Sequence, residues 1–570
     1  MAGWKHLPSE IRLIIWDFAA SDFANEPPKF GSLSAVCREW QDYFEGRNFS
    51  SLTIDQFDIP DFGILIQNGR LFRLRNLRLH ILFPAYSCAE SSNAEDDSTV
   101  LLHEMWFSKA LFSLLDILAT EENKLTQEEQ SGPGFTLELS ASSVSDGHHG
   151  FKDFRLSTPY EKLRRRNPHQ PDLPFEQFHR SGSTLYPTCG NNHDFGVEEF
   201  DRVYGGRPLE LQLGTGLQTP IPPRVVKMVT GLLTRRQSYR SVSIAALTFL
   251  MQNCFPSIVN LNIERWQAAR VRHPEAETFL KELLHCPREL ESFHIFEDRS
   301  AISLEPDSYS PTTDTGVSKV LWHICQFPKL QSFSACSVID ANDFFSHFSG
   351  SLAEEMSWPE LRNLCLTAQY LMPTDSWTSD FSIPNETQAW KLLTDATKIA
   401  SLMPKLEVME LWHAAGEMAC IWTYYKTEHR ARLMVRGGFE KVVLNEQPSQ
   451  VQRLAHMAKT WAKYATELLG RHITCEMLLI PERCTNHYWS IGACASFFPC
   501  DIVYHLELAN TILHPLSLQE MKWESTHDNH LSDAPRAVPK PVWTGDTMSG
   551  ENDGESDGGL GDDLAMLQVW

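Results

Sequence analysis

PSIVNLNI, at residues 256–263, is the first of five copies of a short pattern that decides how the second half of this chain folds. In each copy a proline stands two or three residues before the first of three apolar residues. The second apolar residue comes three positions after the first, and the third comes two positions after the second. The other copies are PRELESFHI at 287–295, PKLQSFSA at 328–335, PELRNLCL at 359–366 and PKLEVMEL at 404–411. The alternation that ends each copy is typical of a strand with one face buried.

Helical spacing of apolar residues comes before three of these prolines, at 279–284, 320–327 and 390–402. Because proline disfavours helical backbone in the residue before it, each unit is predicted to be a helix, a stop and a short strand. Alternating helices and strands favour an α/β fold with a parallel sheet, and self-similar units favour a solenoid.

Weaker copies of the pattern lie earlier, at 49–54, 74–79 and 135–139. They are separated from the clear copies by a stretch rich in Pro, Gly, Arg and His, and the chain ends in a Gly- and Ser-rich acidic tail that is expected to be disordered. The predicted organisation is an N-terminal helical module (4–48), a first repeat-like segment (49–154), a loop-rich insert (155–222), a repeat-like target-recognition domain (223–520) and the tail (530–570).

The repeated unit resembles leucine-rich repeats, with two departures. The proline-to-proline spacings are 31, 41, 31 and 45 residues, longer than the usual 20–29. The position that normally holds a ladder-building Asn or Cys is Trp266, Asp298, Val338, Gln369 or Ala414. The interpretation is an irregular, divergent solenoid, and the alternative is an α/β domain whose strands are similar by coincidence.

In such a solenoid, alternate strand residues face outward along one concave sheet, where mixed polar side chains and an exposed aromatic suit recognition of a target protein. The residues predicted to do so are Asn260, Asn262, Ser292, His294, Ser332, Ser334, Asn363, Thr367, Glu410 and Trp412.

The N-terminal stretch LPSEIRLIIWDFAASDFANEPPKFGSLSAVCREW, at 7–40, predicts two short amphipathic helices. Ile11, Ile14, Ile15 and Phe18 share one helix face, and apolar residues from Leu33 to Phe44 follow helical spacing again. A module of about forty residues is near the lower limit for independent folding, so this surface is expected to be buried against something else.

This arrangement resembles an F-box, the motif through which substrate receptors attach to the Skp adaptor of cullin-based ubiquitin ligases, and is similar to the F-box proteins of filamentous fungi. The resemblance implies adaptor contacts by Leu7, Pro8, Ile11, Ile15, Leu33, Val36, Cys37 and Trp40; Glu10 and Arg38 also match the motif. It further implies a non-catalytic receptor that joins an unknown target protein to the adaptor and, through it, to cullin. The alternative is a helical hairpin that packs on the rest of this chain.

Composition narrows the function classes. A net charge of −23 argues against nucleic acid as a partner, and no apolar run approaches the roughly 20 residues that span a bilayer. The N-terminus lacks an apolar signal region, so the cytoplasm or nucleus is expected and secretion is not. The thirteen cysteines include no CxxC pair, which favours reduced thiols.

Motifs that carry chemistry are missing from the sequence: there is no phosphate-binding loop, nucleophile elbow or HExxH. Cys475, Cys484, His487, Cys494 and Cys500 are spaced too widely for the tight chelate loops of structural zinc, so no metal, cofactor or catalytic residue is predicted. Two alternatives remain open. One is a Skp-binding scaffold without a role in ubiquitination, and the other is an enzyme within 225–520.

Overall fold

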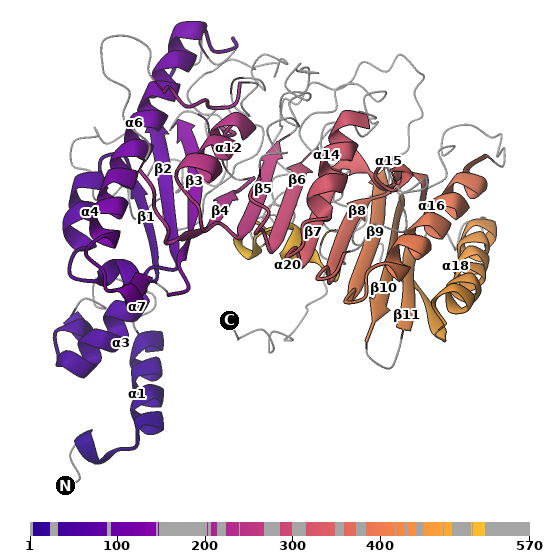
Figure 1. The fold of residues 1–570 in the computed structure, drawn as a ribbon, viewed down its shortest axis with the longest axis horizontal. Coiled ribbons are helices and arrows are strands. Elements are labelled where there is room, and N and C mark those ends of the chain that lie inside the picture. Colours follow the sequence, from indigo (N-terminus) through magenta and orange to yellow (C-terminus); the bar gives the residue numbers. More distant parts are fainter. Residues whose placement is uncertain are drawn as a thin grey trace, which may run out of the picture. The chain divides into compact units, whose positions relative to one another are not determined.

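The computed structural model describes residues 4–22, 32–87, 93–143, 207–213, 224–266, 286–298, 315–347, 358–371, 384–415, 418–427, 431–439, 448–470, 472–480 and 506–518, apart from residues 131, 237 and 239, with isolated residues between these ranges. In this part of the chain twelve strands form one sheet, and their order in space is their order in sequence (Figure 1). The strands are β1 (Ser51–Asp55), β2 (Asn76–Phe83), β3 (Phe135–Ser143), β4 (Val229–Thr234), β5 (Asn260–Trp266), β6 (Ser292–Asp298), β7 (Ser332–Asp340), β8 (Asn363–Thr367), β9 (Val408–Ala415), β10 (Met418–Lys426), β11 (Ala431–Phe439) and β12 (Ile473–Ile480).

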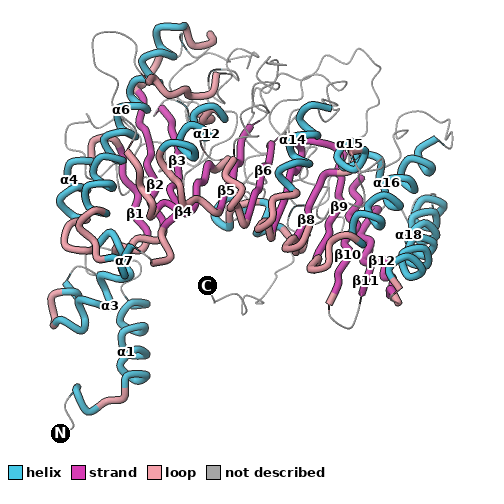
Figure 2. The backbone as a smooth tube through the Cα atoms, in the orientation of Figure 1, coloured by secondary structure: helices cyan, strands magenta, loops and turns pink. Residues whose placement is uncertain are grey.

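Equivalent positions of the repeated pattern pair with one another across the sheet, as Leu261 does with Phe293 and Phe333 with Leu364. These side chains form a buried row facing a layer of helices (Figure 2). The row runs through Leu77, Leu137, Leu232, Leu261, Phe293, Phe333, Leu364 and Met409. The helices that contribute to this core are α4 (Ile59–Leu65), α6 (Asp97–Glu122), α12 (Ile244–Asn253), α14 (Thr315–Cys325), α15 (Ala341–Ser346), α16 (Pro384–Ser401) and α18 (Pro448–Leu469). The predicted α/β fold is therefore confirmed, with a sheet that is mostly parallel.

One hairpin interrupts the parallel order. β10 pairs antiparallel with β9 and with β11, whereas all other neighbouring strands are parallel. Trp422 and Tyr424 of β10 still face the helical layer, where both rings contact Trp461 of α18. The hairpin thus widens the sheet without changing which face is buried.

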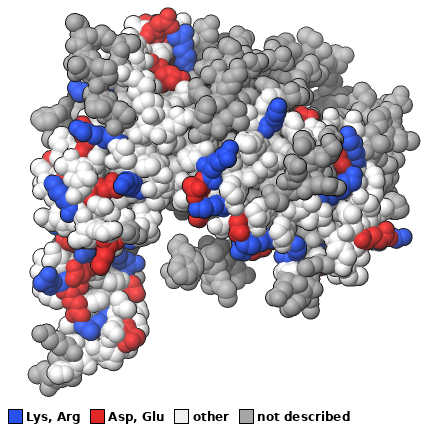
Figure 3. All heavy atoms as spheres, viewed as in Figure 1, with Lys and Arg blue, Asp and Glu red and all other residues white. Residues whose placement is uncertain are grey.

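Charged side chains pair between successive repeats near the start of the strands. Lys405 Nζ lies 2.6 Å from a Glu360 oxygen, and Lys329 pairs with Glu289 in the same way. Figure 3 shows Lys and Arg side chains beside Asp and Glu side chains on the face viewed there. Exposed pairs of this kind contribute little to stability, so the apolar rows hold the sheet together.

Residues 506–518, here called the covering segment, lie on the face of the sheet opposite the helical layer. The segment contains the short helix α20 (Ala509–Ile512), drawn in yellow behind β5–β7 in Figure 1. Its fully buried Ile512 and Leu513 pack with Phe296, Cys336 and Trp412 of the sheet in a second apolar core. The sheet is therefore buried on both faces in this region.

The N-terminal module consists of η1 (Trp4–His6), α1 (Ser9–Asp22) and α3 (Arg38–Asn48). The helix expected through Leu33 and Phe44 is split, because Cys37 has extended backbone (φ −164°, ψ 171°) and precedes the first residue of α3. Ion pairs of 2.9 Å join Glu45 to Arg70 and Asp42 to Arg73, so α3 is fixed to η2 (Arg70–Arg73) beside the β1 edge of the sheet.

Other expectations have mixed outcomes. The helices predicted at 320–327 and 390–402 form as α14 and α16, whereas the one at 279–284 lies outside the described residues. The alternating run IVYHLEL at 502–508 predicts a further strand, and this prediction is wrong, since none of its described residues is in a strand. Most of the 155–222 insert and the whole 530–570 tail also lie outside the described residues. No described helix is long and apolar enough to cross a membrane.

Candidate functional site

One face of α1 carries four large apolar side chains that the described residues cover only in part. Ile11, Ile14, Ile15 and Phe18, here called the apolar patch, are 43, 49, 36 and 68% exposed. The opposite side of α1 is satisfied within the module, where Trp16 is buried against Phe44 of α3. Because exposed clusters of this kind mark interaction sites on proteins, the apolar patch is a candidate docking surface.

The other residues predicted to contact the adaptor divide into two groups. Pro8, Val36 and Cys37 are exposed, Val36 at 59%. Leu7, Leu33 and Trp40 are half-buried. The Trp40 ring lies 5.5 Å from that of Phe44 and 5.8 Å from that of Trp4, measured between ring centroids. Trp40 therefore supports the interior of the module and offers only part of its surface to a partner.

Polar contacts fix the two helices of the module to each other. Glu39 accepts a 2.9 Å hydrogen bond from Trp4 Nε1 and pairs with Arg12, and Arg47 donates to Asp17 at 3.0 Å. Burial and the neighbouring Asp17 raise the pKa of Tyr43 to about 12, so its hydroxyl stays protonated and donates to Asp17. The apolar patch is thus presented on a preorganised support.

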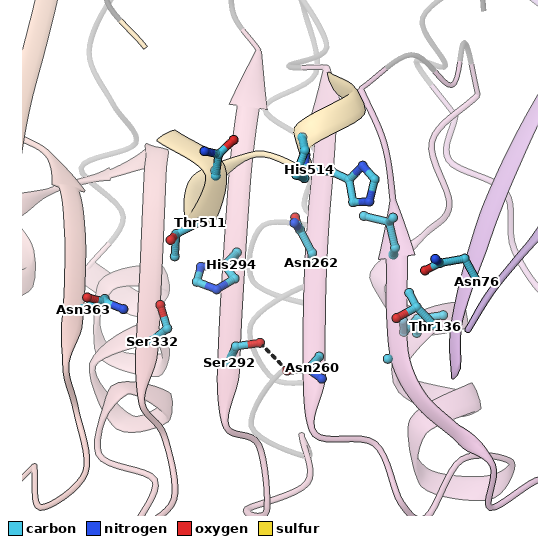
Figure 4. Close-up of a pocket in the computed structure, with 15 residues that line it drawn as sticks. Asn76, Thr136, Asn260, Asn262, Ser292, His294, Ser332, Asn363, Thr511 and His514 are labelled. Atoms are coloured by element: carbon cyan, nitrogen blue, oxygen red, sulfur yellow. Dashed lines mark hydrogen bonds between the residues drawn. The ribbon is translucent and has the colours of Figure 1, made fainter. Parts of the chain in front are cut away.

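A second candidate site lies on the sheet face opposite the helical layer. A pocket of about 380 Å³, here called the groove, is bounded by strand side chains on its floor and by the covering segment along one wall (Figure 4). Six residues predicted to bind a target lie in it: Asn260, Asn262, Ser292, His294, Ser332 and Asn363. The remaining lining residues are Asn76, Thr136, Gly231, Leu232, Leu233, Asn510, Thr511, His514 and Pro515.

The polar groups of the groove are only partly satisfied. Ser292 Oγ donates to Asn260 Oδ1 at 2.8 Å, and His294 Nδ1 lies 3.0 Å from Ser334 Oγ. Asn262 Oδ1 and Ser332 Oγ are buried and have no hydrogen-bond partner among the described residues. Burial lowers the pKa of His294 to about 4, so its ring is neutral near pH 7. The groove therefore offers neutral hydrogen-bonding groups.

The other four residues predicted to bind a target are buried. Glu410 and Trp412 are completely buried where the covering segment contacts them, and Thr367 and Ser334 are also buried. The expectation of an exposed aromatic on this face is wrong for Trp412, because its ring packs against the apolar side chains of the covering segment. A sequence signal for this is the apolar character of Leu506, Leu508, Ile512 and Leu513.

Two buried carboxyl groups hold the covering segment on the sheet. Glu410 of β9 accepts hydrogen bonds from the backbone N–H groups of Glu507 and Leu508 at 3.2 and 3.1 Å, and from Thr423 Oγ1 at 2.8 Å. Glu264 of β5 accepts from the N–H of His514 at 2.6 Å and from that of Arg236 at 3.1 Å. The segment is thus anchored at both ends.

Stability is expected to fall between about pH 5 and pH 7 because of Glu264. Burial raises its pKa to about 7 in the folded chain, against a usual value near 4.5. The folded state therefore favours the protonated form, and stability is lost as pH rises through this window, by roughly 3 kcal/mol in total. The side chain of the Glu264→Gln variant is neutral at every pH. The difference in melting temperature between pH 5 and pH 8 should therefore be smaller for this variant than for wild type. Equal differences for variant and wild type would contradict the assignment.

One buried carboxylate elsewhere on this face is paired with two cations. Glu138 lies 3.1 Å from Arg78 and 2.8 Å from Arg235, and although burial opposes it, the two cations lower its pKa. No group of three or more metal-ligating side chains occurs among the described residues. Cys475 is half-buried, and the other members of its sequence cluster lie outside the described part of the chain.

Comparisons with known proteins give one partial match. Residues 285–514 match a family of unknown function, DUF6546. The matched region begins just before β6 and ends within the covering segment, so it includes both the second half of the sheet and most of the segment that packs on it. No curated protein and no solved structure matches the chain.

Proposed function

We propose that this chain is a substrate-recruiting subunit of a Skp–cullin–F-box ubiquitin ligase, with residues 4–48 as the F-box and the sheet as a divergent leucine-rich-repeat-like solenoid that holds a target protein. Such a subunit forms no covalent intermediate. It fixes a target beside the ligase and so raises the effective concentration of the target lysine.

The observation that carries the proposal is the apolar patch. Ile11 and Ile15 belong to the F-box-like motif, and both remain exposed although the module has its own small buried core of Trp16, Ala20 and Phe44. A foreign adaptor that covered them would bury surface that the described part of the chain leaves exposed. An ordinary hairpin packing on its own chain would bury these side chains instead.

The sheet supports the receptor half of the proposal. Polar side chains from successive strands converge in the groove, and a site on a rigid sheet is held more accurately than one on a loop. The F-box-like module and the groove use different parts of the chain, so one partner can be held while the other is bound.

Reconstitution separates this function from the alternative of a scaffold without a ligase role. The full-length chain, purified with the Skp adaptor and cullin, is expected to form one complex by size-exclusion chromatography and to promote ubiquitin transfer to proteins captured with it. A complex with the adaptor that excludes cullin would favour the scaffold. Failure to bind the adaptor at all would refute both.

A further inference from the structure

One row of side chains crosses the groove floor in continuous register. Pairing between neighbouring strands places these residues in line: Asn76, Thr136, Gly231, Asn260, Ser292, Ser332 and Asn363. Since neighbouring strands lie about 4.8 Å apart, the row extends over roughly 29 Å from its first member to its last. The floor is therefore long, and every position of the row except Gly231 carries an amide or hydroxyl side chain.

The asparagines of this row recur at equal intervals. Asn76, Asn260 and Asn363 are each three strands apart, which corresponds to about 14 Å. An extended peptide advances about 3.4 Å per residue and presents every second residue to the same side, so four residues also cover about 14 Å. A primary amide carries both donors and an acceptor, as a peptide group does. The spacing of the three asparagines thus equals the spacing of every fourth residue along one face of an extended peptide.

Unsatisfied polar atoms point independently to a ligand. Ser332 is only 8% exposed, lines the groove, and its Oγ has no hydrogen-bond partner among the described residues. Asn262 Oδ1, in the neighbouring row of the groove floor, is also buried and has no hydrogen-bond partner among the described residues. Leaving such groups unpaired costs free energy that a hydrogen-bonding ligand recovers.

The charge of the groove restricts what that ligand is. Among the described residues that line it there is no Asp, Glu, Lys or Arg, and the histidines there, His294 and His514, have pKa values lowered by burial. A phosphate or other ion placed on this floor would lose hydration without gaining a counter-charge. Groups that are polar but uncharged suit the floor better.

We propose that the groove binds an extended peptide of about nine residues whose contacting side chains are uncharged and unphosphorylated. The peptide crosses strands β2–β8, with asparagine amides pairing to its backbone. That this peptide belongs to a target of ubiquitination rests on the function proposed above, whereas the binding itself does not.

The test is a selection of displayed nine-residue peptides against the full-length chain, followed by fluorescence anisotropy on the enriched sequence. Asn260→Ala combined with Asn363→Ala is expected to weaken binding by about thirtyfold, since several hydrogen bonds are lost. The matched control is Asn253→Ala, an exposed asparagine on α12 of the opposite face, which should bind within about twofold of wild type. A phosphoserine version of the peptide should bind about tenfold more weakly or worse.

Three results would overturn the proposal: no peptide enriched above background, equal binding by the double variant, or tighter binding of the phosphopeptide. If the double variant unfolds at a lower temperature than wild type, a second variant, Thr511→Arg, tests whether the peptide binds in the groove. It narrows the groove from the covering segment and leaves the sheet unchanged. Retained binding in that variant also refutes the groove. Adaptor binding, measured on the same preparations, reports on the ligase proposal separately.

Discussion

Ile11→Glu combined with Ile15→Glu is expected to weaken binding of the Skp adaptor by at least a factor of about one hundred. Burying each large apolar side chain contributes roughly 1.5–3 kcal/mol, so losing two of them costs about 3–6 kcal/mol even before the penalty for burying a carboxylate. Both side chains are exposed in the free chain, so the substitutions should leave its thermal stability nearly unchanged. Isothermal titration calorimetry with the purified adaptor measures the effect.

The matched control uses another exposed apolar pair. Ile64 and Leu65, at the end of α4, are 67 and 50% exposed and lie outside the F-box-like module. Ile64→Glu combined with Leu65→Glu makes the same chemical change and should leave adaptor binding unaffected. An unchanged affinity in the Ile11 and Ile15 variant, or an equal loss in both variants, would speak against docking through the apolar patch.

Glu410→Ala is expected to destabilise the covering segment by roughly 3–5 kcal/mol. The substitution leaves the N–H groups of Glu507 and Leu508 and the Thr423 hydroxyl without their shared acceptor in a buried environment. Hydrogen exchange of the Glu507 and Leu508 amides should accelerate strongly, and peptide binding in the groove should weaken because the groove loses its wall.

The control for this carboxyl group is Glu410→Gln. Burial raises the pKa of Glu410, so a neutral amide of the same size resembles the form that the site favours and keeps an oxygen acceptor. Its single oxygen can replace Glu410 Oε1, the acceptor for the Glu507 N–H and the Thr423 hydroxyl, whereas its NH2 group cannot accept from the Leu508 N–H. The variant should therefore retain most of the protection of the Glu507 amide but not of the Leu508 amide. Equal exchange rates of the Glu507 amide in the alanine and glutamine variants would speak against Glu410 as the anchor.

The strands were predictable where the pattern was complete. The five proline-led copies became β5–β9, because the positions of the second and third apolar residues fix which side faces the helices. β4 was missed because Thr234 takes the place of the third apolar residue, although Val229 and Leu232 keep the spacing. β10 and β11 form an antiparallel hairpin outside the repeat, so no copy of the pattern announced them.

For the candidate site in the groove, only the face of the sheet that carries it could be predicted from the sequence. Residues two apart in a strand point to the same side, so Asn260, Asn262 and His294 followed from the alternation alone. Whether a side chain on this face is exposed could not be predicted from the alternation, because the contacts that bury Trp412 and Glu410 come from residues far along the chain. The 2.6 Å bond from His514 to Glu264 joins positions 250 residues apart, and local periodicity carries no information about such a pairing.

The covering segment also alters how the stack of strands should come apart. In repeat proteins each unit contacts only its neighbours, so melting tends to spread unit by unit from an end. Here one short stretch is tied to β9 through Glu410 and to β5 through Glu264, strands that are not adjacent. β5–β9 are therefore expected to melt as one cooperative block, with fraying confined to the flanks of the sheet.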